Sequence, residues 1–261
     1  MQEPDADRPA RPALRRDRRE RSGRDAGGDA TGARLKVGSL FGAAGPSPVA
    51  SGEQDGDAPT LLVVCTGNIC RSPLGELLLR DRLAPLGVHV HSAGTHALVG
   101  FAMQTQSQRI ALEHGVSPQD AASHRARQVT EPMLRRADLT LTMTRSQRRG
   151  VVEKAPRALR RAFPVREFAA LAELVPDIDL REAAEAAVAA TGADTLRTRL
   201  AGAISCVSAR RGLVPLDTDA DDVIDPYRRP ADVYDESAAQ LLPAIDEVIR
   251  VVSAVLPAPR S

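Results

Sequence analysis

The sequence predicts an α/β protein with a three-layer, doubly wound fold, in which a parallel β-sheet lies between helices on both of its faces. Two observations predict this class. Short apolar segments with β propensity alternate with longer segments whose apolar residues recur at helical spacing, and Gly or Pro separates most of these segments. Hydrophobic residues make up 43% of the 261 residues and charged residues 26%, which is enough for a packed core.

The first part of the chain is predicted to be a disordered tail. Residues 1–59 mix Arg with Asp and Glu and are rich in Gly, Ala, Ser and Pro, with almost no apolar periodicity. Such a segment cannot bury enough apolar surface to offset the entropy that it loses on ordering. We therefore expect the folded domain to cover residues 60–256.

The first half of that domain is predicted to hold two strands and two helices. The apolar run Leu61–Val64 is predicted as a buried strand. A helix is expected to follow it, with Ser72 as its N-cap and Pro73 in its first turn. The alternating segment Val88–Ser92 is predicted as a second strand, and the segment from about Gln104 to His114 as a second helix.

The second half repeats this alternation of strands and helices. Its predicted elements are a strand over Ala137–Thr142, a helix over Ser146–Lys154, a short fourth strand within Ala162–Phe168 and a final helix over Ala231–Val255 that Pro243 bends or splits. Residues from about 177 to 222 break the pattern with Ala- and Arg-rich stretches and an acidic loop. We interpret them as a helical insertion packed beside the main domain.

Composition and charge exclude two classes of protein. The 35 basic and 34 acidic residues give a formal net charge of +1, and only 2% of residues are aromatic, which argues against nucleic-acid binding. No apolar run reaches the ~20 residues of a membrane span.

Three cysteines are too few, and odd in number, for a disulfide framework, which indicates a reducing compartment. We expect a cytoplasmic protein that does not insert into a membrane.

One segment has the pattern of an anion site with a built-in nucleophile. The first strand runs into CTGNICRSP, residues Cys65–Pro73, and a helix follows. A turn between a strand and a helix N-terminus directs consecutive backbone N–H groups into one concavity, where the helix end adds positive potential. Arg71 can bind two oxygens of a phosphate there, and the Cys65 thiolate is expected to form near neutral pH. Gly67 permits a positive φ in this turn, and Asn68 tolerates one.

A second segment supplies a candidate acid. A thiolate that attacks phosphorus in line needs a group that protonates the leaving oxygen. The best candidate is Asp225 in the segment VIDPYRRP, where Pro226 stiffens the turn and Tyr227 offers an apolar wall with a polar tip. Asp-Pro alone is a common turn pair, so this interpretation depends on the cradle described above. In that cradle, Ser72 is placed to donate a hydrogen bond to the thiolate.

Four motifs together resemble the low-molecular-weight protein tyrosine phosphatases. They are VVCTGNICRSP around Cys65, SAGT over Ser92–Thr95, HRARQV over His124–Val129 and DPY over Asp225–Tyr227, and they occur in the family's order. The resemblance covers roughly Thr60 to Val255, apart from the insertion. It implies a four-stranded parallel sheet with helices on both sides and the hydrolysis of phosphotyrosine in proteins, with no metal and no other cofactor.

The resemblance also implies a role for each residue of the site. Cys65 would be the nucleophile that forms a phosphocysteine intermediate. Arg71 would bind the phosphate and stabilise the transition state, and Asp225 would be the general acid and then the base for the hydrolytic water. Leu98 and Tyr227 would flank the phenyl ring. The other phosphate-binding positions would be Thr66, Gly67, Asn68, Ile69, Cys70 and Ser72.

Within the family, the sequence resembles the bacterial branch that is paired with tyrosine autokinases of exopolysaccharide export. This resemblance depends on ALVG over Ala97–Gly100 and on DPYR, and it suggests such a kinase as a partner. The sequence departs from the family at two places. Many members have Trp at the position of Leu98, so a thinner wall is expected here. The insertion lengthens the segment that delivers Asp225.

Other interpretations of the same residues stay open. An arsenate reductase needs further cysteines to relay electrons, and only Cys206 lies downstream. A protein arginine phosphatase tends to carry Thr at the position of Ile69, where a bulky apolar side chain disfavours a guanidinium. A phosphate-binding scaffold without activity would not need the nucleophile, arginine and acid that are all present. A zinc site at Cys65 and Cys70 lacks the usual second pair of ligands, whereas a reversible disulfide between them would protect the thiolate.

Overall fold

The computed structural model describes residues 58–213 and 222–256. The predicted tail therefore lies outside the described residues except for its last two positions. Most of the predicted acidic loop of the insertion, residues 214–221, also lies outside them.

Four parallel strands form one sheet in the order β2-β1-β3-β4. Strand β1 (Thr60–Cys65) pairs with β2 (His89–Gly94) on one side and with β3 (Leu139–Thr142) on the other, and β4 (Ala162–Pro164) pairs with β3. The chain leaves β1 for one neighbour and later returns to its other side. The carboxyl end of β1 is therefore the switch point at which doubly wound sheets bind ligands.

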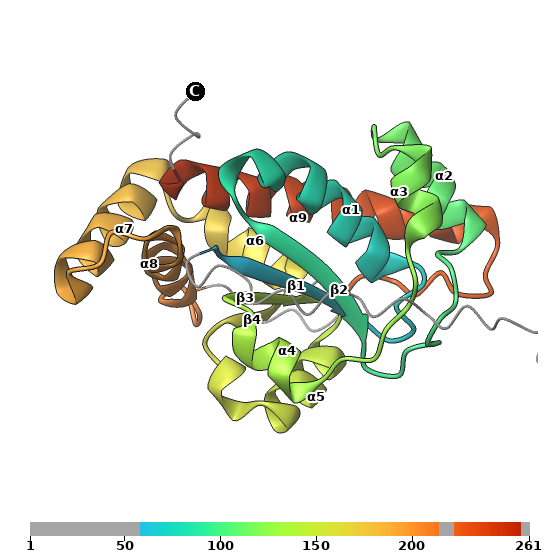
Figure 1. Cartoon of the computed structure of the whole chain (residues 1–261), viewed down its shortest axis with the longest axis horizontal. Coiled ribbons are helices and arrows are strands. Elements are labelled where there is room, and N and C mark those ends of the chain that lie inside the picture. The colour runs from blue at the N-terminus through green and yellow to red at the C-terminus, as the bar shows by residue number, and fades with distance from the viewer. Residues whose placement is uncertain (1–57, 214–221, 257–261) are drawn as a thin grey trace, which may run out of the picture. The chain divides into compact units, whose positions relative to one another are not determined.

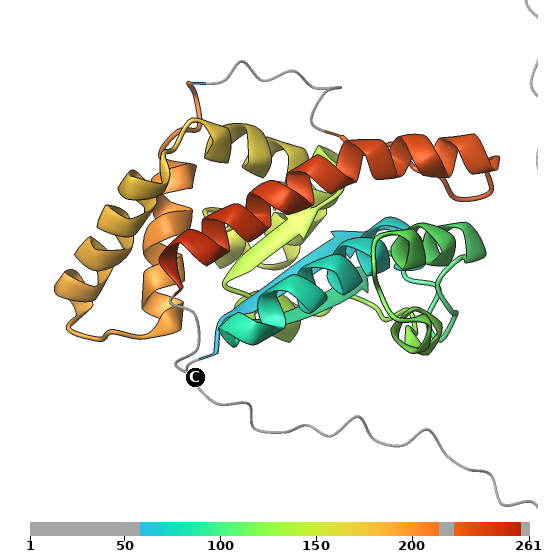
Figure 2. The same cartoon turned by 90° about the horizontal axis from the view of Figure 1, so that it is seen from above.

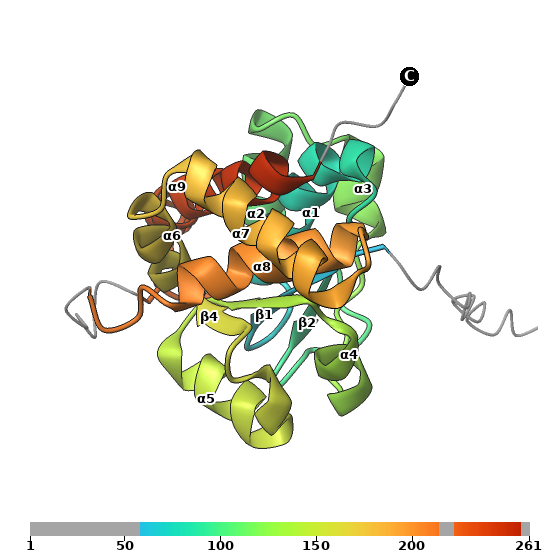
Figure 3. The same ribbon diagram turned by 90° about the vertical axis from the view of Figure 1, so that its left-hand side faces the viewer.

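Helices cover both faces of this sheet (Figures 1 and 3). One face carries α1 (Arg71–Leu83), α6 (Val165–Glu173) and α9 (Ala231–Val255), with α2 (Thr105–Glu113) and α3 (Pro118–Ser123) beside them. The other face carries α4 (Glu131–Arg136) and α5 (Arg145–Lys154). Two 3₁₀ turns, η1 (Ala84–Leu86) and η2 (Pro156–Ala158), join elements of these layers. The predicted three-layer α/β fold with a four-stranded parallel sheet is confirmed.

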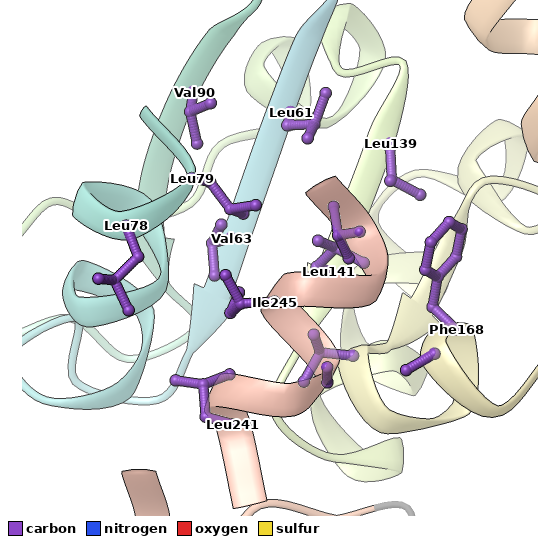
Figure 4. Close-up of a cluster of buried hydrophobic side chains, with 14 of the residues drawn as sticks. Leu61, Val63, Leu78, Leu79, Val90, Leu139, Leu141, Phe168, Leu241 and Ile245 are labelled. Carbon is purple, nitrogen blue, oxygen red and sulfur yellow. The ribbon is translucent and has the colours of Figure 1, made fainter. Parts of the chain in front are cut away.

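The larger core fills the space between the sheet and the layer of α1, α6 and α9. Figure 4 shows one part of it, where Leu61 and Val63 of β1 and Leu141 of β3 meet Leu79 and Ile245 from the helices. The alternate residues of β1 point into a second core against α4 and α5. Burial of each such side chain stabilises the fold by about 1.5–3 kcal/mol. Strand β1 is thus fixed on both faces, and so is the position of the residue at its end.

Two further helices lie in the segment that the sequence marks as an insertion. Helices α7 (Asp177–Thr191) and α8 (Leu196–Ser208) pack against each other and against α9 (Figure 2). Their approach is close, because a Cβ on Gly202 would lie 2.4 Å from the carbonyl oxygen of Ala183. None of the described helices is both long and apolar enough to cross a membrane.

Several local predictions differ from the structure. Ser72 lies inside α1, and the N-cap position belongs to Cys70, which makes no capping hydrogen bond with its side chain. The predicted short strand within Ala162–Phe168 is present as β4, but the apolar residues after Pro164 begin α6, a helix that the sequence does not indicate because a short apolar run fits a strand and a buried helix equally well. Pro243 does not split α9. Helices α3 and α4 have six residues each, too few to give a periodic signal.

Candidate active site

The loop between β1 and α1 forms a cradle at the carboxyl end of the central strand. It comprises Thr66–Cys70, with Cys65 as the last residue of β1 and Arg71 as the first residue of α1. The first turn of α1 has neither an acidic residue nor a side-chain cap. Its free N–H groups and the positive end of the helix dipole are therefore available to an anion in the cradle.

The cradle is held from outside through its carbonyl groups. The N–H groups that bind them belong to the segment Thr95–Gln104, which we name the clamp loop. The carbonyls of Cys65, Thr66, Gly67 and Ile69 accept from the backbone N–H groups of Thr95, His96, Leu98 and Gln104, at 2.8–3.0 Å. The Asn68 carbonyl accepts from Nε2 of His124 at 2.8 Å. In a trans peptide the following N–H points the opposite way, so the N–H groups of the cradle point inward.

The thiol of Cys65 lies at the bottom of the cradle and is 2% exposed. Its Sγ is 2.9 Å from Oγ of Ser72 and accepts a hydrogen bond from the Asn68 N–H at 3.2 Å. Nδ2 of Asn68 donates to the same Ser72 oxygen at 2.9 Å. The Ser72 hydroxyl can donate to the sulfur or to the carbonyl of Ala93, which is 3.5 Å away.

The backbone of Asn68 is left-handed, with φ of 56°. Of the two residues at which the sequence allows a positive φ, Asn68 adopts one and Gly67 does not. Asn tolerates this conformation better than most residues. It also bonds Ser72 and Ser92 through its amide nitrogen and the Arg127 N–H through its amide oxygen.

Behind the cradle, the hydrogen bonds continue to a buried carboxylate. Oγ of Ser92 donates to Glu76, a residue of α1. The same carboxylate lies 3.4 Å from Nη2 of Arg127 and 3.7 Å from Nδ1 of His124. Burial lowers the pKa of His124, and the Asn68 carbonyl and the Glu76 carboxylate oppose that effect. These groups fix the Asn68 and Ser72 side chains that surround the sulfur.

Arg71 lines the same cavity as the thiol and is 4% exposed. Its Nη1 donates to the carbonyl of Val223 at 2.9 Å, and its Nη2 lies 2.6 Å from Oδ2 of Asp225. Its buried Nε has no hydrogen-bond partner among the described residues. The edge formed by Nε and Nη2 is the edge that binds two oxygens of a phosphate, and here it holds only one carboxylate oxygen.

The segment before α9 places Asp225 in the cradle despite the long insertion before it. The Val223 N–H donates to the carbonyl of Met143, just after β3, at 2.8 Å. Gln240 and Ser237 of α9 bond the backbone N–H and carbonyl of Ile224, at 2.9 and 3.1 Å. The Asp225 side chain remains 52% exposed, so its carboxyl group can reach both the cradle and solvent.

A cavity of about 140 Å³ opens above the thiol. It is lined by Cys65, Thr66, Gly67, Ile69, Cys70, Arg71, His96, Leu98, Asp225 and Tyr227. Ile69, Leu98 and the Tyr227 ring give it apolar walls around a charged base. This combination suits a flat aryl group that carries an anion.

The second thiol of the cradle has a different chemistry. Burial raises the pKa of Cys70 to about 12, although a side-chain contact with Tyr234 opposes this shift. Its Sγ lies 3.9 Å from the buried hydroxyl of Tyr234. Cys70 therefore stays protonated at neutral pH and is not a nucleophile. All three cysteines are free thiols.

Comparison with known proteins assigns the family. The family model described as "Low molecular weight phosphotyrosine protein phosphatase" matches residues 60–180. The low molecular weight protein-tyrosine-phosphatase Ptp of Acinetobacter johnsonii is 34% identical over 103 residues, which cover 40% of this chain and 69% of that protein. The chain belongs to the low-molecular-weight protein tyrosine phosphatase family.

Two further relatives of this phosphatase-family chain differ in the activity that their names give. The probable low molecular weight protein-tyrosine-phosphatase EpsP of Ralstonia solanacearum is 43% identical over 97 residues, 37% of this chain and 63% of that protein. A protein-arginine-phosphatase of Geobacillus stearothermophilus is 34% identical over 108 residues, 41% of this chain and 70% of that protein. The chain thus spans less than two thirds of the length of some curated relatives.

A solved structure supports the fold of the family. The tyrosine phosphatase AmsI of Erwinia amylovora superposes with a TM-score of 0.52 and 24% sequence identity, over 77% of this chain and 97% of that one. At this identity the likeness concerns the architecture alone. It extends over most of both chains, beyond the segment that the family model matches.

The structure brings together the residues that the sequence singles out. The predicted nucleophile, arginine and acid line the cavity with the two predicted flanking residues, Leu98 and Tyr227. Ser72 contacts the sulfur and does not line the cavity. Cys206 lies on α8, away from it. Among the described residues, no group of three or more His, Cys, Asp or Glu side chains is arranged to hold a metal ion.

Sequence reasoning missed the supports of the cradle. The SAGT and HRARQV motifs signal the family, but their physical role is visible only in the structure. The clamp loop holds the cradle's carbonyls, and Gly94 leaves room for the carbonyl of Thr66. Ser92 bonds Asn68 and is itself held by Glu76. Glu76 has the spacing of an ordinary helix residue, so only its burial reveals it.

Replacing Gly94 with Ala is expected to disturb both the fold and the site. A Cβ at this position would lie 2.4 Å from the carbonyl oxygen of Thr66 and 3.0 Å from Ala97, so the cradle and the clamp loop must separate. We expect the free energy of unfolding to fall by about 1–3 kcal/mol and kcat to fall by roughly 10²-fold. Denaturant unfolding and aryl phosphate hydrolysis measure both effects.

Gly150 offers the matched control for that variant. It lies in α5 with a helical backbone, and a Cβ there meets nothing within 4 Å. Gly150→Ala should leave kcat unchanged and should not destabilise the protein. Equal effects of the two substitutions would show that the contact between Gly94 and the cradle is not important.

Proposed function

We propose that this protein is a protein tyrosine phosphatase that hydrolyses phosphotyrosine through a phosphocysteine intermediate. The observation that carries the proposal is the arrangement of three groups around one cavity. They are a thiol that accepts a hydrogen bond from the Asn68 N–H and contacts the Ser72 hydroxyl, a buried arginine with a free Nε, and a carboxyl group paired with the Nη2 of that arginine. These are a nucleophile, a phosphate clamp and a proton donor at the base of an aryl-sized pocket.

In the first step the oxygens of the substrate phosphate accept hydrogen bonds from the inward N–H groups of the cradle and from Nε and Nη2 of Arg71. Asp225 is thereby displaced from the guanidinium and faces the leaving oxygen. The Cys65 thiolate attacks phosphorus, an S–P bond forms and the P–O bond to the tyrosine ring breaks. The electron pair of that bond goes to the phenolic oxygen, which takes a proton from the Asp225 carboxyl group.

In the second step a water molecule attacks the phosphocysteine. The Asp225 carboxylate takes a proton from this water, an O–P bond forms, and the S–P bond breaks. Inorganic phosphate leaves and the thiolate of Cys65 is regenerated. The Ser72 hydroxyl and the Asn68 N–H lie within hydrogen-bond distance of the sulfur, so both can donate to it as it attacks and as it departs.

Phosphoproteins are the proposed substrates, and a tyrosine kinase of polysaccharide export is the proposed partner. The kinase follows only from the resemblance of ALVG and DPYR to that branch of the family. A cytoplasmic location is proposed on the free thiols of the site, which need a reducing compartment. An aryl phosphate and a phosphotyrosine peptide test the activity, and a phosphoarginine peptide and arsenate test the rivals.

Protein arginine phosphatase activity is the second candidate, because one relative carries that name. Ile69 argues against it. Its side chain is buried and lines the cavity, so a guanidinium bound there would lose hydration without gaining a hydrogen bond from this wall.

Ile69→Thr tests this specificity directly. The smaller, hydroxyl-bearing side chain should shift the ratio of kcat/KM for phosphoarginine over phosphotyrosine peptides upward by about tenfold. We expect wild type to prefer phosphotyrosine by at least that factor. The conservative variant Ile69→Val keeps the wall apolar and should leave the ratio near that of wild type. A wild-type preference for phosphoarginine would refute the tyrosine assignment without affecting the phosphocysteine mechanism.

A further inference from the structure

A second cavity, of about 440 Å³, lies at the opposite end of the sheet from the active-site cradle. Asp138 and Arg161, which line it, immediately precede β3 and β4, so the cavity is at the amino ends of these strands. Its far wall is α8, from the segment that we interpret as an insertion. The catalytic steps proposed above use none of its residues.

Three arginines give this cavity an excess of positive charge. Arg157 and Arg160 make no hydrogen bond or ion pair with any described residue. Arg161 is held in place, since its Nη2 donates to the carbonyls of Leu134 and Arg135 at 3.3 and 2.9 Å.

The single carboxylate of the cavity does not balance this charge. Asp138 accepts a hydrogen bond from the Thr60 N–H at 2.8 Å and lies 3.2 Å from Nε of Arg197. This carboxylate thus pairs with Arg197, which does not line the cavity, and it also attracts Arg161. The three lining arginines therefore outnumber the one carboxylate that they share with Arg197.

One face of α8 supplies the other wall. The residues that line the cavity recur at helical spacing and are small or apolar, with two hydroxyl groups: Ala201, Ile204, Ser205, Ser208 and Ala209. The small side chains leave the space open, the hydroxyls can donate hydrogen bonds, and Ile204 with the alanines gives an apolar strip.

The two walls are tied together just beside the cavity. Arg211, which follows α8, donates to the carbonyls of Leu159 and Ala162 at 3.2 and 2.8 Å, and its guanidinium lies 3.8 Å from the centre of the Phe163 ring. It also pairs with Glu167 at 2.9 Å. The loop that carries Arg160 and Arg161 is thus fixed to α8, and the cavity exists before any ligand arrives.

We propose that this cavity binds a small organic phosphate. Guanidinium groups bind phosphate oxygens in pairs, and three of them beside one carboxylate that also pairs with Arg197 favour a multiply charged anion over a single carboxylate. The serine hydroxyls complete the polar end of the site. The apolar strip of α8 is suited to the organic part of the molecule, and the volume is that of a small-ligand site.

Calorimetric titration with ADP and with inorganic pyrophosphate tests the proposal. The proteins are wild type, the double variant Arg157→Gln/Arg160→Gln and the control Arg82→Gln/Arg149→Gln. The control removes the same charge from exposed arginines that line neither this cavity nor the active site. Any binding at the active-site cradle is common to all three proteins, and aryl phosphate hydrolysis should remain at the wild-type rate in each.

Wild type and the control should bind one more equivalent of ADP than the cavity variant, or should bind it at least tenfold more tightly. Pyrophosphate should bind this site more weakly than ADP, because it lacks the organic part. Equal ADP binding by all three proteins would overturn the proposal. If the cavity variant and the control lost ADP binding to the same extent, the loss would come from the change in net charge alone, and the proposal would also be overturned. If pyrophosphate bound as tightly as ADP, the organic part would make no contribution to binding, and this would contradict the proposal that the ligand is an organic phosphate.

Discussion

Replacing Cys65 with Ser is expected to lower kcat for phosphotyrosine hydrolysis by about 10⁴-fold or more. A hydroxyl is a poor nucleophile unless a base removes its proton, and the partners of this position are the Ser72 hydroxyl and the Asn68 N–H, neither of which is a base. The cradle keeps its N–H groups and Arg71, so phosphate binding should persist. Steady-state kinetics with a phosphotyrosine peptide measures the loss, and inhibition by inorganic phosphate measures the retained binding.

Cys206→Ser is the matched control, because it makes the same chemical change on α8, away from the cavity. It should leave kcat and KM unchanged. Both variants should unfold at denaturant concentrations close to that of wild type. If Cys65→Ser retained a tenth of the wild-type kcat, covalent catalysis by this residue would be refuted.

Replacing Asp225 with Asn is expected to lower kcat for phosphotyrosine by about 10²–10⁴-fold. The amide cannot give a proton to the departing phenolic oxygen or take one from water. The loss should depend on the leaving group. Tyrosine, with a pKa near 10, needs the proton, whereas an aryl phosphate with a more acidic phenol leaves more readily without it. Comparing the two substrates separates proton transfer from a purely structural role.

Asp246→Asn provides the charge-matched comparison, since this residue is exposed on the same helix, α9, that follows the acid segment. It should behave as wild type with both substrates. A loss in Asp225→Asn that is equal for the acidic phenol and for tyrosine would assign Asp225 a positioning role through Arg71 rather than a role as the acid.

The fold could be predicted from the sequence because its strands are short apolar runs separated by turn residues. Leu61–Val64 and Ala137–Thr142 are examples, and the observed strands β1 and β3 overlap them closely. The predicted fourth strand is present as β4, but the sequence does not indicate α6, the helix that follows it, because the short apolar run after Pro164 suits a strand as well as a helix. The packing of this run against α9 favours the helix. The order of the strands follows from tertiary packing, which no local pattern contains.

The site could be predicted in part for a similar reason. Cys65, Arg71 and Ser72 lie close together in one strand–loop–helix segment, so their spacing in the sequence already places them in one site. Asp225 is far from them in the chain, and it was predicted from the need of the cradle for an acid together with the DPY motif of the family that the sequence resembles. The hydrogen bonds that hold the cradle were not predicted, because Gly94 and Glu76 act through contacts that join three separate segments.

The phosphoryl group on Cys65 is the most direct test of the proposed mechanism. Asp225→Asn should form the intermediate readily from an aryl phosphate with an acidic phenol and should hydrolyse it slowly, because water then lacks its base. Rapid acid quenching followed by peptide mass spectrometry should find the mass of one phosphoryl group on the peptide that contains Cys65. The same peptide should be unmodified in the double variant Cys65→Ser/Asp225→Asn. Turnover by Asp225→Asn with no modified Cys65 at any quench time would contradict the covalent mechanism.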